Sequence, residues 1–142
     1  MTHKNKEIVK HAAIGTAIVF VLIFIFSVAF GNREITPNEM AGEMEKNLDG
    51  MVTVFYNSSE DLYQMDATDP ELIAEIEQLL IYHAGEEEWA GISEDLAAAS
   101  ERIDKRTGKD SAIMFMNPEY PDLYLLLVQD GEILYNVTND YY

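Results

Sequence analysis

The longest apolar stretch of the chain lies close to its N-terminus. Residues 12–30 are nineteen consecutive residues without a charge, and twelve of them are Ile, Val, Leu or Phe. As a helix, this stretch is about 28 Å long, which is close to the thickness of the hydrocarbon layer of a bilayer. The pattern therefore predicts a transmembrane signal-anchor helix over residues 12–30, which would contact membrane lipid.

The charges on either side of this stretch predict its orientation. Lys4, Lys6 and Lys10 precede it, whereas mostly acids follow Arg33. Because basic segments stay in the cytoplasm, we expect residues 1–11 to be cytoplasmic and the C-terminal part to be extracytoplasmic. The alternative is a signal peptide that is cleaved near Ala29 and releases a secreted protein, since Ser27-Val28-Ala29 has the small-x-small form of a cleavage site.

After a linker over residues 31–36, residues 37–142 show the alternating periodicities of one folded domain. Thr36, Pro37 and Glu39 form a helix start, and Met40, Met44 and Leu48 follow at helical spacing. A second helix start lies at Thr68 to Glu71. The predicted elements are a helix over 37–48, strands over 51–57 and 62–65, helices over 70–84 and 93–107, and strands over 111–116, 123–129 and 132–138.

The third predicted helix begins with Ser93 as its N-cap and ends at Gly108. In the C-terminal hairpin, Asp130-Gly131 is a two-residue turn signal. Pairing Gln129 with Glu132 places Val128 opposite Ile133, Leu126 opposite Tyr135 and Tyr124 opposite Val137. The strand over 123–129 is apolar on both faces, so we expect it to be central and the following strand to lie near an edge.

The predicted order is α-β-β-α-α-β-β-β, which indicates an α+β domain with a small, mostly antiparallel sheet and helices on one face. This order resembles that of PAS-like extracytoplasmic sensor modules, in which two strands, a helical insertion and three strands form one sheet. The resemblance implies a ligand-sensing or ligand-binding module as the alternative function, with a pocket beside residues 118–121.

Composition excludes several classes of function. The 142 residues include 26 acids, 9 Lys or Arg and no cysteine, for a formal net charge of −17. Nucleic acid is excluded as a partner because binding its backbone requires clustered cations. The missing cysteines exclude disulfides, thiolate nucleophiles and thiolate zinc sites. An acidic surface instead favours a basic protein partner.

No catalytic, cofactor-binding or metal-binding residue is predicted. A Ser-His-Asp triad would need His83, which is the only histidine after residue 11 and which we expect to pack at a helix end. A small hydrolase is therefore the less favoured hypothesis. Calcium needs only oxygen ligands, and short runs of acids offer them, but no EF-hand pattern occurs. These runs are Asp66, Asp69 and Glu71, and Glu86, Glu87 and Glu88.

The leading hypothesis is a membrane-anchored, extracytoplasmic accessory domain that is not an enzyme and that binds another envelope protein. Aromatic residues commonly anchor such interfaces. The candidates are Trp89, Tyr120, Tyr141 and Tyr142, together with the acids Glu86, Glu87 and Glu88. The alternative for Trp89 is a position in the core. The alternative for Tyr141 and Tyr142 is that the chain end is frayed and makes no contact.

Overall fold

The structure is a computed structural model that describes residues 34–141. The predicted anchor over residues 12–30 lies outside the described residues. Among residues 34–141, no helix is both long enough and apolar enough to cross a membrane.

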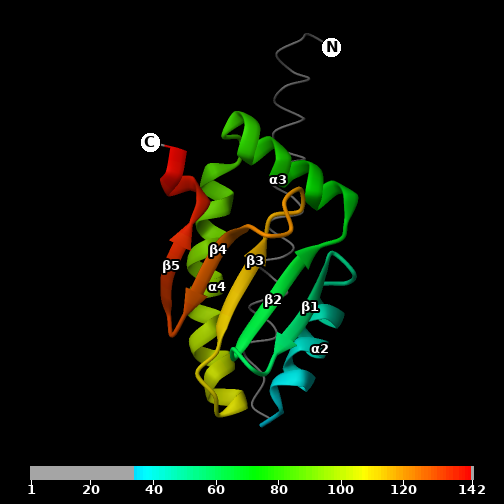
Figure 1. The fold of residues 1–142 in the computed structure, drawn as a ribbon, viewed down its shortest axis with the longest axis vertical. Coiled ribbons are helices and arrows are strands. Elements are labelled where there is room, and N and C mark those ends of the chain that lie inside the picture. Colours follow the sequence, from blue (N-terminus) through cyan, green and yellow to red (C-terminus); the bar gives the residue numbers. More distant parts are fainter. Residues whose placement is uncertain (1–33, 142) are drawn as a thin grey trace.

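Three α-helices, five strands and a terminal 3₁₀ helix make up the described part of the chain (Figure 1). The predicted α+β class and order of elements are confirmed. The elements are α2 (Pro37–Asn47), β1 (Val52–Asn57), β2 (Leu62–Ala67), α3 (Pro70–Tyr82), α4 (Glu86–Thr107), β3 (Ala112–Met116), β4 (Tyr124–Gln129), β5 (Glu132–Asn136) and η1 (Val137–Tyr141).

The five strands form one sheet in the order β1-β2-β3-β4-β5. Three neighbouring pairs are antiparallel, and β2 pairs with β3 in parallel. The sheet is mixed because α3 and α4 carry the chain from the end of β2 back to the starting end of β3, so that both strands run in the same direction. As expected from its apolar sequence, β4 is a central strand, and β5 is an edge strand.

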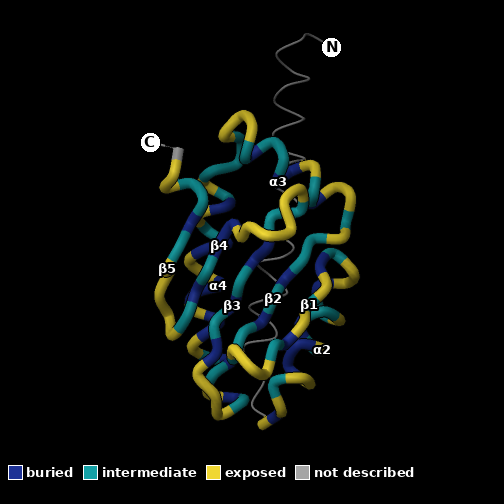
Figure 2. The backbone as a smooth tube through the Cα atoms, viewed as in Figure 1, coloured by how far each residue is buried: buried dark blue, intermediate teal, exposed yellow. Residues whose placement is uncertain are grey.

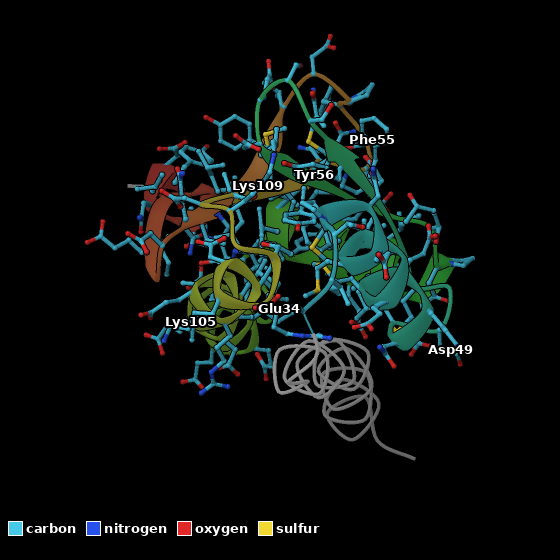
Figure 3. All side chains as sticks on the ribbon, turned by 90° about the horizontal axis from the view of Figure 1, so that it is seen from below. Glu34, Asp49, Phe55, Tyr56, Lys105 and Lys109 are labelled. Carbon is cyan, nitrogen blue, oxygen red and sulfur yellow. The ribbon has the colours of Figure 1, made fainter. Side chains whose placement is uncertain are left out.

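Two helices cover the same face of the sheet, α2 over β1 and α4 over β3, β4 and β5 (Figures 1 and 3). The helix α3 lies across one end of the sheet. The hydrophobic core fills the space between these elements, and the strands alternate between buried and more accessible positions (Figure 2). The largest side chains of this core include Trp89, Tyr63, Phe115 and Met40, each at most 1% exposed. We call the opposite side of the sheet the open face, because no helix of the described residues lies over it.

Local capping explains where the first two helices begin. The Thr36 side chain accepts a hydrogen bond from the Glu39 amide at 3.2 Å, and Pro37 occupies the first turn of α2. The Asp69 carboxylate accepts one from the Leu72 amide at 3.0 Å and so caps α3. Each cap satisfies an amide that has no partner within its helix.

The predicted start of α4 at Ser93 is wrong, because the helix begins seven residues earlier at Glu86. Glu86, Glu87 and Glu88, which fall between two predicted helices, form the first turn of α4, where negative charge complements the helix dipole. Ser93 lies inside the helix, and its hydroxyl donates to the Trp89 carbonyl oxygen at 2.8 Å. A serine can occupy either position, because its hydroxyl can cap a helix start or donate to the carbonyl oxygen four residues earlier within a helix.

The predicted register of the last hairpin is correct only beside its turn. Gln129 pairs with Glu132 and Val128 with Ile133, but Leu127 then pairs with Tyr135 and Leu126 with Asn136. Leu134 is left unpaired as a β-bulge. Every later residue of β5 therefore lies on the face opposite to the one that the predicted register gave it. Tyr135 therefore lies on the open face and Asn136 faces the core.

Candidate functional site

The open face carries a row of mostly apolar side chains that crosses the whole sheet. The pairings Phe55 with Gln64, Gln64 with Met114, Met114 with Leu127 and Leu127 with Tyr135 connect all five strands. Phe55 lies on the side away from α2 and α4 (Figure 3), and 63% of it is exposed. We call these five residues the central row. A sheet with one solvated face normally carries polar residues there, so the central row is unusual.

More aromatic and apolar groups adjoin the central row near the β3–β4 connection. The rings of Tyr124 and Tyr135 meet edge to face with their centroids 5.1 Å apart. Tyr120 and Leu123 in the connection are 59% and 56% exposed. The connection is shaped by Asn117, whose side-chain oxygen accepts hydrogen bonds from the amides of Glu119 and Tyr120. The apolar surface thus extends beyond the strands.

The charged residues of the described strands are all acids. Residues 34–141 contain 25 acids and only 5 Lys or Arg, and all five cations lie on α2, on α4 or in the loop after α4. No strand within residues 34–141 contains Lys or Arg. Two of these acids lie on the open face. Asp66 is two residues after Gln64 on β2, and Glu132 pairs with Gln129, which is two residues after Leu127 on β4. The result is an apolar row with acids beside it.

Three of the described cations have carboxylate partners of their own. The Arg106 guanidinium lies 3.0 Å from a Glu43 oxygen and is 8% exposed. The Lys105 and Lys109 ammonium groups lie 4.0 Å from Glu101 and 3.8 Å from Asp61. These pairs further reduce the positive charge that the domain offers to an anion.

The structure separates the predicted interface residues from one another. Trp89 is 1% exposed and belongs to the core, so its ring is not on the surface of the folded domain. Tyr120 is exposed in the β3–β4 connection. Glu86, Glu87 and Glu88 form the first turn of α4, with Glu87 the exposed one. Tyr141 ends η1, and Tyr142 lies outside the described residues.

Trp89 is held by a buried polar network that the sequence did not suggest. Its indole N–H donates to the Asn136 side-chain oxygen at 3.0 Å, and the Asn136 amide donates to the Ser93 hydroxyl at 3.2 Å. The Trp89 ring also meets Phe115 edge to face, with centroids 5.7 Å apart. This network joins α4 to the edge strand β5, which the bulge at Leu134 makes possible.

His83 ends α3 in a left-handed conformation with φ 57°, and 46% of its side chain is exposed. It is therefore at a helix end, as predicted, but is not packed there. Its Nδ1 lies 3.7 Å from a Glu86 oxygen. Charged or not, the ring faces an acid rather than the hydrophobic core.

Three carboxylates come together at the end of the sheet near the β4–β5 turn, a grouping that sequence spacing did not reveal. Asp104, Asp110 and Asp130 each place an oxygen within 4.8 Å of the others. Burial raises the pKa of Asp104 to about 6, and the nearby charges of Asp110 and Asp130 act in the same direction, while the Ser111 amide opposes them. The Ser111 amide donates to Asp104 at 3.0 Å. Such a group holds a proton under mildly acidic conditions.

Two of the acids in the short runs that offer oxygen ligands, Asp66 and Asp69, make contacts within the domain. Asp69 caps α3, and Asp66 accepts a hydrogen bond from the side-chain amide of Gln64 at 3.1 Å.

A depression of about 320 Å³ lies between the start of α2 and the last turn of α4. It is lined by Glu34, Thr36, Glu39, Lys105 and Thr107, among other residues. It lies at the opposite end of the sheet from residues 118–121, where the sensor hypothesis expects a pocket (Figure 1).

No protein-family model, no curated protein and no solved structure matches this chain. The resemblance to PAS-like modules in the order of elements therefore stays a prediction. The sequence contained one signal for the open face, because both β3 and β4 are apolar on both faces. This pattern correctly predicted a central strand, but it could not show that one of its faces stays uncovered.

Proposed function

We propose that this chain is a single-pass membrane protein that displays a non-catalytic acidic domain on the outer side of the membrane, where the domain binds another envelope protein. The observation that carries the proposal is the open face, with its apolar central row and its lack of cations. Exposed apolar surface bordered by polar groups is typical of protein interaction sites. Acids around it favour a basic partner.

The short stretch of sequence between the predicted anchor and the folded domain supports the same function. Glu34 is the first described residue, and the predicted span ends at residue 30. The chain between them reaches at most about 14 Å, because an extended residue spans about 3.5 Å. A domain on so short a tether stays close to the membrane surface, where other envelope proteins lie.

Co-purification from gently solubilised membranes tests this function. The full chain is extracted with a mild non-ionic detergent at low salt, and we expect one envelope protein to elute with it in a constant ratio. Because salt screens the attraction between opposite charges, the complex should weaken as the salt concentration rises. The double variant Met114→Gln/Leu127→Gln should lose the partner, whereas Ile81→Gln should retain it, since Ile81 is 62% exposed on α3 and lies outside the central row. A lone monomer at low salt would contradict the proposal.

A further inference from the structure

The size of the central row limits what can cover it. Its five residues cross four gaps between strands, and neighbouring strands are about 4.8 Å apart, so the row is about 19 Å long. An α-helix rises about 1.5 Å per residue and needs about 13 residues to span this distance. The other face of the same sheet is already covered by helices, α2 over β1 and α4 over β3, β4 and β5.

Both edges of the sheet are poorly suited to an added strand. At the β1 edge, the Val54 amide lies 3.4 Å from a Glu45 carboxylate oxygen, and α2 packs against the strand. At the β5 edge, the Leu134 bulge interrupts the regular ladder. Proteins use such features to prevent edge-to-edge pairing. A partner therefore reaches the domain through the side chains of the open face rather than through backbone pairing.

The charges select among the partners that could use this face. Two copies of this chain that met through their open faces would each contribute Asp66 and Glu132 to the interface, and no described strand of either copy offers a cation to pair with them. Like charges at an interface oppose association. A partner with an apolar stripe and Lys or Arg on its flanks instead gains both burial and electrostatic attraction.

From these observations we propose that the open face binds a cationic amphipathic helix of another protein, with the apolar side of that helix on Phe55, Met114, Leu127 and Tyr135. This inference rests on the proposed function and specifies the chemistry of the partner. It predicts apolar residues at i, i+3, i+4 and i+7 in the bound segment, flanked by basic residues.

A model peptide tests the inference directly. The full chain is placed in nanodiscs of zwitterionic lipid, with empty nanodiscs as the blank, and is titrated with a peptide of about 15 leucine and lysine residues whose leucines fall on one helical face. A peptide of the same composition in scrambled order is the control for charge alone. We expect the ordered peptide to bind at least tenfold more tightly than the scrambled one.

Variants of the chain locate the contact. Met114→Gln/Leu127→Gln should weaken binding of the ordered peptide at least tenfold, and Ile81→Gln should leave it unchanged. Phe55→Gln is a second variant, because a side chain that is 63% exposed at the sheet edge can be replaced without opening the core, and it should weaken binding about threefold. Equal binding of both peptides, an equal effect of Ile81→Gln, or a dimer of the chain that dissociates in the open-face variants would each overturn the inference.

The results separate this inference from the proposed function. Suppose an envelope protein co-purifies and is lost in the open-face variants, but the ordered peptide does not bind. The function then stands, and the helical partner is wrong. If no protein co-purifies although the peptide binds the open face, the surface chemistry stands and the proposed function is contradicted.

Discussion

Asp104 shows how partial burial changes the chemistry of one carboxyl group. Its pKa is raised from the ordinary value of 3.8 to about 6, mainly by burial. The folded chain therefore keeps this proton between about pH 4 and pH 6, while the unfolded chain has lost it. The contribution of Asp104 to stability is largest at low pH and is lost as the pH rises through this window.

Replacing this carboxyl by a neutral amide should stabilise the protein at neutral pH. In Asp104→Asn the side-chain oxygen still accepts from the Ser111 amide, and the charge beside Asp110 and Asp130 is removed. We expect the free energy of unfolding at pH 7.5 to rise by about 1 kcal/mol, and the gain to disappear near pH 4.5. Urea unfolding at both pH values measures it. Asp95→Asn, at an exposed position of α4, is the matched control, and an equal gain there would contradict the prediction.

Asn136 is the residue on which the buried polar network depends. Its side chain joins Trp89 and Ser93, and its oxygen also accepts from the Thr138 amide and hydroxyl. Asn136→Ala should lower the free energy of unfolding by about 2–3 kcal/mol, because the indole N–H loses its acceptor in the core. Chemical denaturation measures the loss. The exposed neighbour Asn139 provides the control, and a loss below about 0.5 kcal/mol in Asn136→Ala would show that the network contributes little.

At the scale of elements, the β4–β5 hairpin gives a prediction that concerns backbone conformation. Gly131 has φ 80°, its amide lies 3.2 Å from the Ser100 hydroxyl, and an added Cβ would lie 3.2 Å from a Glu101 oxygen. Gly131→Ala should therefore destabilise the protein by about 1–2 kcal/mol. Gly42 lies inside α2 with open space around it, so Gly42→Ala should stabilise by about 0.5–1 kcal/mol. Thermal unfolding measures Tm for both variants. A change in Tm of the same sign in Gly131→Ala and Gly42→Ala would contradict the prediction.

Most elements followed from local sequence because periodicity and turn residues determine them locally. Pro37 and Pro70 start α2 and α3, and Asp130-Gly131 forms the predicted turn. The Leu134 bulge could not be predicted in this way, because Ile133, Leu134 and Tyr135 are consecutive apolar or aromatic residues that fit either register. The observed register brings Asn136 to partners that are distant in sequence. Asn136 reaches Trp89 across 47 positions of the chain.

The candidate site was harder to predict than the fold for a similar reason. Met114 and Leu127 were recognisable as apolar, but an apolar residue in a central strand looks the same in sequence whether its face is covered or open. The grouping of Asp104, Asp110 and Asp130 depends on the meeting of a helix end and a hairpin turn. In a chain with 26 acids, sequence spacing gives no sign of which ones meet.

At the scale of the whole molecule, the excess of acids should make salt act in opposite directions on folding and on binding. Residues 34–141 carry 25 acids against 5 Lys or Arg, so their mutual repulsion opposes the compact state. Raising NaCl from about 20 to about 300 mM screens this repulsion and should raise Tm by a few degrees. The same change should weaken binding of a cationic partner. Calorimetry and the peptide titration measure the two effects, and a Tm that falls with salt would contradict the account of the surface.

The most direct test of the central claim is site-specific photo-crosslinking in intact cells. A photoreactive residue at position 127 on the open face is compared with one at position 95, which is exposed on α4 on the other side of the sheet. The account predicts adducts from position 127 that map to a basic, amphipathic segment of one envelope protein, and few from position 95. Equal adducts from both positions, or adducts from position 127 only to another copy of this chain, would contradict it.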